Sequence, residues 1–230
     1  MRTVGILGVM GPETVARFFL QINARARASD NTQYPPLILN NVPVPYDLER
    51  EIVERGRNEE QILPFLVRGV QSLEAAGVDS IVIPCNTVHY FMPELRACVA
   101  PPILSIMEET ADVCARAEYR TVGLLATTET ITHELYEQEL ARYGIQVVTP
   151  DLTEQRLVST IIQRILDGNK SVENTQALLR VIRTLQSGGA EAVILGCTAL
   201  ELVLQQPDSS VPLLDSFEIL AVATVRELLR

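Results

Sequence analysis

Residues 76–87 read AGVDSIVIPCNT, and a closely similar segment, GGAEAVILGCT, follows at 188–198. Each segment joins a glycine turn to a run of apolar residues and then to a cysteine. An apolar run that follows a turn predicts a buried strand. The two cysteines, Cys85 and Cys197, are therefore expected at matching strand ends.

Two further echoes flank this pair of segments in the same order. RTVGIL at 2–7 returns as RTVGLL at 120–125, and APPIL at 100–104 returns as SVPLL at 210–214. The displacement is close to half of the 230-residue chain in every case. A repeat at nearly constant offset indicates a duplicated structural unit.

Each unit alternates short apolar runs with longer segments of helical period. The expected strands lie at 4–7, 37–40, 80–83 and 103–104, and at 121–125, 146–149, 192–195 and 212–214. The expected helices cover 13–28, 59–76, 132–143, 154–166, 171–187 and 217–229. Strands that are apolar on both faces and alternate with helices are typical of covered parallel sheets. The sequence thus predicts an α/β fold of two similar Rossmann-like domains, each a short parallel sheet with helices on both faces, related by pseudo-two-fold duplication.

We expect residues 1–105 plus 215–230 to form the first domain and residues 106–214 to form the second, with the active site in the cleft between them. Ligands of parallel sheets bind beyond the carboxyl ends of the strands. The candidate ligand-binding segments are therefore those that follow the strands, at 8–13, 40–46, 85–89, 126–129 and 197–201.

Composition restricts the partners and the chemistry. The chain has 29 Asp and Glu against 19 Lys and Arg, a net charge of −10, so nucleic acids and anionic membranes are poor partners. Lys170 is the only lysine, which argues against Schiff-base and pyridoxal-phosphate enzymes.

No apolar run approaches the roughly 18 residues of a membrane span, and no signal peptide is evident. A cytoplasmic protein is expected.

The four cysteines fall into two groups. They include no CxxC pair and have only two histidines to join them, so neither a disulfide framework nor a metal site is predicted. Cys98 and Cys114 fall within helical stretches and are expected to pack as small apolar residues. Cys85 and Cys197 precede helix starts, where the helix dipole and backbone N–H groups are expected to lower the pKa of a thiol.

The matched positions of Cys85 and Cys197 suit proton transfer better than packing. Two units that face each other would place these thiols on opposite sides of one cleft. Racemisation and epimerisation require such a pair, because one group removes a proton from a carbon while the other delivers a proton to the opposite face. A structural pair of cysteines is the alternative.

Four motifs together resemble those of the aspartate/glutamate racemase family, the cofactor-independent two-cysteine enzymes. They are GVMGPE at 8–13, PCNTVH at 84–89, ATT at 126–128 and GCT at 196–198. The resemblance implies an active site between two α/β domains, a small amino-acid substrate, no cofactor, no metal and a homodimer. It implies that Cys85 and Cys197 are the catalytic pair. The implied substrate-binding residues are Met10 in the pocket wall and Asn86, Thr87, Thr127, Thr128 and Thr198 at the α-carboxylate and amine.

Several positions depart from the family pattern. Ala199 stands where the family usually has glutamate, and Arg50 lies three residues beyond the arginine position of aspartate racemases. Leu166 replaces a lysine and leaves Arg164 and Lys170 as neighbours. Such cations would clamp a distal carboxylate by charge-assisted hydrogen bonds, so Arg50 is expected in that role.

The leading hypothesis is racemisation of an acidic amino acid, with L-aspartate to D-aspartate as the first choice. One alternative is a glutamate racemase or a broad-specificity amino-acid racemase. Related cysteine chemistry, such as a decarboxylase or a cis–trans isomerase, is another. A non-catalytic amino-acid-binding protein of the same fold is the alternative from a different functional class.

The remaining polar motifs have simpler interpretations. The glycines at 5, 8 and 11 are spaced GxxGxxG, so a dinucleotide loop is not favoured. His89 lies about one helical turn beyond Cys85 and either orders the loop or tunes the thiol. His133, beside Glu134 in an acidic helix start, is expected at the solvated surface. The glutamates at 49, 51, 54, 59 and 60 predict a solvated helix face or a lid over the cleft.

Overall fold

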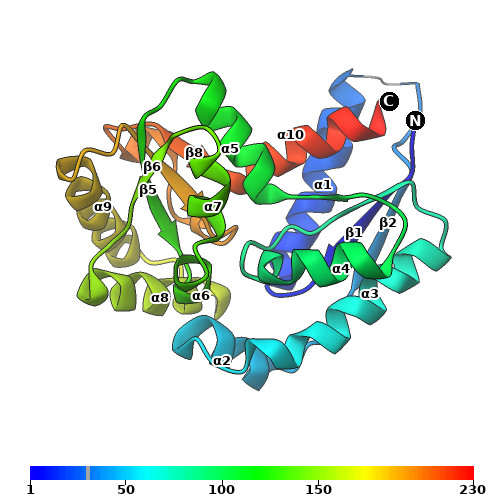
Figure 1. Cartoon of the computed structure of the whole chain (residues 1–230), viewed down its shortest axis with the longest axis horizontal. Helices are drawn as coiled ribbons and strands as arrows, with labels where there is room; N and C mark the ends of the chain where they lie inside the picture. The colour runs from blue at the N-terminus through cyan, green and yellow to red at the C-terminus, as the bar shows by residue number, and fades with distance from the viewer. Residues whose placement is uncertain (30–31) are drawn as a thin grey trace.

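The computed structural model describes residues 1–29 and 32–230. Within these ranges the chain forms two four-stranded sheets with equivalent strand orders, β2-β1-β3-β4 and β6-β5-β7-β8. Every strand pair is parallel, and helices pack around both sheets (Figure 1). The predicted α/β fold of two similar parallel-sheet units is confirmed.

The first sheet comprises β1 (Val4–Gly8), β2 (Leu37–Asn41), β3 (Ser80–Val82) and β4 (Ile103–Leu104). Its helices and 3-10 turns are α1 (Pro12–Ser29), α2 (Tyr46–Arg55), η1 (Glu59–Ile62), α3 (Leu63–Ala75), η2 (Thr87–Phe91) and α4 (Met92–Cys98). All residues of β1 and β3 are buried, because these two strands are covered on both faces.

The second sheet comprises β5 (Thr121–Ala126), β6 (Gln146–Val148), β7 (Ala192–Gly196) and β8 (Leu213–Asp215). The helices and 3-10 turns of this half are α5 (Ile106–Arg116), α6 (Thr128–Thr132), α7 (Leu135–Ala141), α8 (Leu152–Leu166), α9 (Val172–Ser187), η3 (Leu200–Leu202), η4 (Gln206–Asp208) and α10 (Ser216–Leu228). In the described ranges, no helix combines the length and apolar character needed to cross a bilayer.

The two sheets repeat each other in register as well as in strand order. Val4 of β1 lies opposite Ser80 of β3, and Val122 of β5 lies opposite Ala192 of β7. These four residues occupy equivalent positions in the sequence echoes. The repeat in the sequence is therefore a repeat in structure, and it brings Cys85 and Cys197 to equivalent strand ends.

Helix α10 connects the two halves. It packs against α1 on one side and α5 on the other, and it runs across the seam between the sheets (Figure 1). The rings of Phe18 and Phe217 meet edge to face with centroids 5.2 Å apart. Because α10 contacts elements of both halves, the domain division at 1–105 plus 215–230 and 106–214 stays a prediction.

One expected helix is broken in the structure. The predicted helix at 132–143 is wrong at its start, because α6 ends at Thr132 and α7 begins at Leu135. Glu134 between them adopts a left-handed conformation with φ of 52°, which interrupts a helix. The turn leaves His133 between the two helices and directs it toward the first half of the chain, as described below.

Gly69 sets the distance between α3 and the first sheet. A Cβ atom at this position would lie 2.5 Å from Cδ1 of Leu7 and 2.9 Å from Cγ2 of Val42. We predict that Gly69→Val lowers the free energy of unfolding by about 1–3 kcal/mol through overpacking. Gln71→Val, on the exposed side of the same helix, is the control for urea denaturation. Equal stability of the two variants would contradict this close approach.

Candidate active site

The carboxyl ends of central strands from both sheets meet at one small cavity. Cys85 follows β3 and Cys197 follows β7, and both line it, together with Met10 beyond β1 and Thr127 beyond β5. The cavity volume is about 20 Å³, close to what one water molecule requires. An amino acid is larger, so binding one requires the lining elements to separate.

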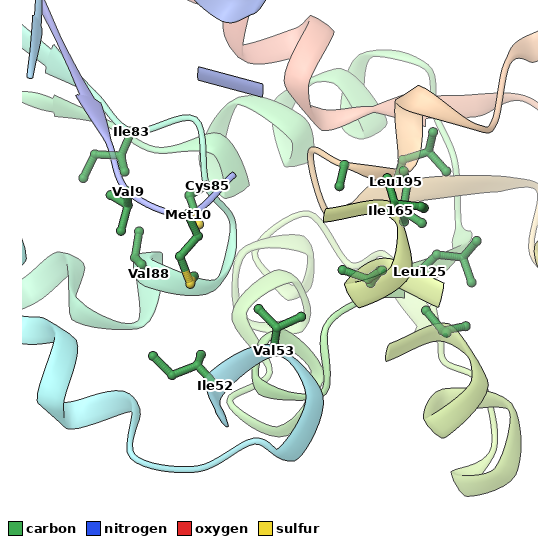
Figure 2. Close-up of a cluster of buried hydrophobic side chains, with 14 of the residues drawn as sticks. Val9, Met10, Ile52, Val53, Ile83, Cys85, Val88, Leu125, Ile165 and Leu195 are labelled. Carbon is green, nitrogen blue, oxygen red and sulfur yellow. The ribbon is translucent and has the colours of Figure 1, made fainter. Parts of the chain in front are cut away.

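Part of the cavity wall is apolar and comes from both halves. Val53 of α2 and Ile162 and Leu166 of α8 contribute to it. Figure 2 shows Met10 and Cys85 on one side, with Val53 of α2 between them and the buried side chains of the second half. Helix α2 packs against α6 and α8 and lies across the gap between the two halves (Figure 1). The glutamate-rich stretch that includes α2 was expected to form either a solvated helix face or a lid over the cleft. The contacts of α2 with helices of the second half favour the lid.

The structure brings most of the predicted site residues together. Those that line the cavity are Met10, Cys85, Asn86, Thr87, Thr127, Cys197 and Thr198. Thr128 and Arg50 lie outside this lining. The Thr128 hydroxyl is 2.9 Å from that of Ser159, and Arg50 is half-exposed and 3.9 Å from a carboxylate oxygen of Asp167. The role of each predicted residue in binding or catalysis stays a prediction.

Hydrogen bonds join the strand-end loops across the seam. The hydroxyls of Thr87 and Thr127 are 3.0 Å apart. The Thr198 hydroxyl lies 3.4 Å from the carbonyl oxygen of Pro84, to which it donates. Each bond links a loop of the first sheet to a loop of the second. The two thiols are therefore presented by loops that hold one another.

A buried polar network fixes Asn86, the neighbour of Cys85. The Tyr136 hydroxyl donates to Oδ1 of Asn86 at 2.6 Å, and Nδ2 of Asn86 is 3.3 Å from the hydroxyl of Ser216. Ser216 in turn donates to the carbonyl of Leu195 in β7 at 2.6 Å. Tyr136 and Ser216 could not be predicted from the sequence, because no motif marks them and only the fold brings them to Asn86.

His89 orders the Cys85 loop through the backbone. Its Nε2 accepts from the Ile106 N–H at 3.1 Å, so Nδ1 carries the proton and donates to the Cys85 carbonyl at 2.8 Å. Burial lowers the pKa of His89 to about 4, which keeps the ring neutral at pH 7. Of the two roles expected for His89, these contacts favour ordering of the loop.

The second cysteine loop is held by a different interaction. Glu201 lies four residues after Cys197, as His89 lies four residues after Cys85. Glu201 is buried and its carboxylate is 3.0 Å from the Arg17 guanidinium of α1. The two loops thus occupy equivalent places in the repeat and are held by chemically different contacts.

The expectation of lowered thiol pKa values is wrong. Burial raises the pKa of Cys85 to about 12 and that of Cys197 to about 11. The backbone N–H groups of Val88 and Ala199 lower these values, as expected at helix starts, but the loss of solvation is the larger effect. Without a ligand, both cysteines are therefore thiols at neutral pH.

His133 is half-buried at the seam, which corrects its expected place at the solvated surface. Its ring stacks on Tyr90 with centroids 3.8 Å apart. Its Nε2 lies 3.2 Å from a carboxylate oxygen of Glu129 and 3.6 Å from one of Glu59. Glu129 lies one helical turn before His133, but Tyr90 and Glu59 come from distant parts of the chain, so the sequence around Glu134 could not reveal them.

The contacts of His89 predict an acid-sensitive contribution to stability. We expect His89→Phe to lower the free energy of unfolding at pH 7 by about 1–3 kcal/mol, because two backbone groups lose a partner. The pKa of His89 is lowered from 6.5 to about 4 in the folded protein. Its stabilisation is therefore present above pH 6.5 and is lost as the pH falls toward about 4.

Urea denaturation of the wild type and His89→Phe at neutral pH and at about pH 5 checks this prediction. The difference in stability between the two proteins should shrink at the lower pH. A difference that stays constant, or grows, would contradict a neutral, buried His89.

Comparison with known proteins assigns a family to this arrangement. The family model described as Asp/Glu/Hydantoin racemase matches residues 7–224. The broad specificity amino-acid racemase RacX of Bacillus subtilis (strain 168) is 30% identical over 226 residues, which cover 96% of both chains.

Two solved structures share the whole architecture. The aspartate racemase homologue of Pyrococcus horikoshii OT3 has a TM-score of 0.81 and 28% identity, with 100% of both chains covered. The aspartate racemase of Picrophilus torridus has a TM-score of 0.82 and 25% identity, with coverage of 99% of this chain and 94% of the other. The chain therefore belongs to the Asp/Glu/hydantoin racemase family.

Proposed function

We propose that this protein is an amino-acid racemase that uses Cys85 and Cys197 as its two acid–base groups, without a cofactor. One observation carries the proposal: the two thiols stand at equivalent strand ends of a duplicated unit and line the same cavity. A substrate Cα atom between them would have one sulfur on each face.

The proposed reaction consists of two proton transfers at Cα. One cysteine, as thiolate, removes the α-proton and becomes a thiol, and the other, as thiol, donates its proton to the opposite face and becomes a thiolate. The roles are exchanged in the reverse direction. Backbone N–H groups at the helix starts would stabilise the negative charge that develops on the α-carboxylate. Asn86 and the cavity threonines would hold that carboxylate and the amine.

Activation of a thiol must accompany substrate binding. Burial keeps both cysteines protonated in the free protein, yet the reaction requires one thiolate. The α-ammonium group of a substrate would bring a positive charge into the cavity, and a nearby positive charge favours the thiolate. The substrate would thus help to form the base that deprotonates it.

Two proposals for the substrate have support: aspartate alone, and a broad range of amino acids. Aspartate, the first expectation, has support from the similarity to the Picrophilus torridus aspartate racemase. Broad specificity has support from the similarity to RacX over 96% of the chain. Among the described residues, those that line the cavity include no cation, which favours a broad-specificity racemase over a dedicated aspartate or glutamate racemase.

The proposal also includes the oligomeric state and the cellular location of the protein. A homodimer is the state that the family resemblance implies, and a cytoplasmic location follows from the sequence expectations alone. Light scattering of the purified protein at several concentrations would test the dimer, since a constant monomer mass would contradict it.

Removal of either thiol should abolish racemisation. We expect Cys85→Ser and Cys197→Ser each to lower the rate at least about hundredfold, because general acid–base groups contribute on this scale. Racemisation is followed by circular dichroism, and Cα deuterium uptake in D2O by NMR, with a panel of single L-amino acids and reduced protein.

Cys98→Ser is the matched control, since Cys98 is partly exposed and its Sγ donates to the Leu95 carbonyl of its own helix at 3.2 Å. It should keep wild-type activity. Amino-acid binding by the wild type without any deuterium uptake would favour the non-catalytic alternative and exclude the racemase.

The raised thiol pKa values predict an alkaline activity profile. Because burial raises the pKa of Cys85 to about 12 and that of Cys197 to about 11, the fraction of thiolate rises with pH throughout the neutral range. The logarithm of kcat/KM should therefore rise with a slope of about one per pH unit between about pH 7 and 9. A flat profile over this interval would show that a thiolate is already present in the free protein.

A further inference from the structure

The strand that leads to Cys197 sets the orientation of the Asn86 side-chain amide. The Leu195 carbonyl in β7 can only accept a hydrogen bond, so the Ser216 hydroxyl, 2.6 Å away, donates to it. This leaves the Ser216 oxygen as an acceptor. It therefore faces the amide nitrogen of Asn86, which lies 3.3 Å away and can only donate.

Tyr136 fixes the other end of the same amide. Its hydroxyl lies 2.6 Å from Oδ1 of Asn86, an oxygen that can only accept. Burial raises the pKa of Tyr136, and this effect exceeds that of the nearby Ser216 and Thr110 hydroxyls, which lower the pKa. The phenol therefore keeps its proton and is a donor to Asn86 throughout the neutral pH range.

A flipped Asn86 amide would lose these hydrogen bonds. Its oxygen would face the Ser216 oxygen, whose proton is already donated to Leu195, and its N–H would meet the proton of the Tyr136 hydroxyl. Asn86, Tyr136 and Ser216 are all buried, and buried polar groups without partners are costly. The network thus selects one of the two amide orientations.

One N–H of Asn86 remains for the cavity. An amide nitrogen carries two hydrogens, and Ser216 accepts one of them. Asn86 lines the cavity beside Cys85, whereas Tyr136 and Ser216 are not among the described residues that line it. Asn86 can therefore offer a donor to a bound molecule, while Tyr136 and Ser216 would act on that molecule through Asn86.

We propose that Tyr136 and Ser216 are positioning residues of the racemase, which hold the Asn86 amide so that its second N–H donates to the α-carboxylate of the substrate. The inference rests on the proposed racemase function and adds two residues to it. Negative charge grows on that carboxylate as the α-proton leaves, so a donor already in place stabilises the transition state more than the bound substrate. The network also links Asn86, next to Cys85, to the strand that ends beside Cys197.

Removal of either hydroxyl tests the proposal. Tyr136→Phe keeps the ring and should lower kcat about tenfold, because the Asn86 amide loses its fixed orientation. KM for the amino acid should change less than about threefold, since the lost stabilisation belongs to the transition state. Ser216→Ala should have the same effect. Racemisation is followed by circular dichroism, and slow variants by Cα deuterium uptake, with the amino acid that the wild type racemises fastest.

A double-mutant cycle with Asn86→Ala distinguishes positioning from a general structural role. If Tyr136 acts through Asn86, Tyr136→Phe should change kcat less than about twofold once the amide is absent. The same cycle with Ser216→Ala decides the question if Tyr136→Phe does not fold. An equal loss of kcat with and without the Asn86 amide would overturn the proposal.

Tyr143→Phe and Thr224→Val are the matched controls. Tyr143 is 51% exposed and follows α7, and the buried Thr224 hydroxyl donates to the Leu220 carbonyl within α10 at 2.7 Å. Each variant removes a hydroxyl of the same kind from a position outside the network, and each should keep the wild-type kcat and KM. A loss of kcat in Thr224→Val as large as that in Ser216→Ala would show that kcat follows the packing of α10, and would overturn the role of Ser216.

The outcomes separate this inference from the racemase proposal. A wild-type kcat in both Tyr136→Phe and Ser216→Ala would overturn the positioning roles and leave the racemase intact. If the wild type racemises no amino acid in the full panel and none takes up deuterium, the proposed function itself fails.

Discussion

The parallel pairing of each central strand with its neighbours is the constraint on which the candidate site depends. β3 lies beside β1, and β7 lies beside β5, in equivalent registers. A shift of one residue would turn the apolar side chains of a strand to the opposite face. The common register therefore carries Cys85 and Cys197 to the same level in the two sheets, where the loops that hold them can meet.

Burial determines the pKa values of the two thiols at the place where these loops meet. Helix starts and backbone N–H groups favour thiolates, and the structure contains both features, yet the pKa of each thiol is raised. The closed cavity explains why: it removes the water that would solvate a thiolate. A cavity that excludes water also strengthens the electrostatic interactions of any charge that enters it. A charged ligand therefore has a large influence on the protonation state of the thiols.

The sequence was informative where the signal is local or repeated. Strand positions, the duplicated unit and the matched places of Cys85 and Cys197 could all be predicted from apolar runs and echoes. Contacts between distant segments could not. The hydrogen bond from Tyr136 to Asn86 joins helix α7 to a loop of the other sheet, and the ion pair between Arg50 and Asp167 joins α2 to the end of α8. Nothing in either local sequence specifies its partner.

The different anchors of the two cysteine loops have a consequence for the symmetry of the reaction. One loop is held by a neutral histidine bound to backbone groups, and the other by an ion pair that salt and pH can weaken. Two enantiomers have equal free energy in solution, so the equilibrium constant of a racemisation is one whatever the protein does. The divergence of the two halves can therefore appear only in kinetics: kcat and KM can differ between the L and D substrates, while the two kcat/KM values must be equal.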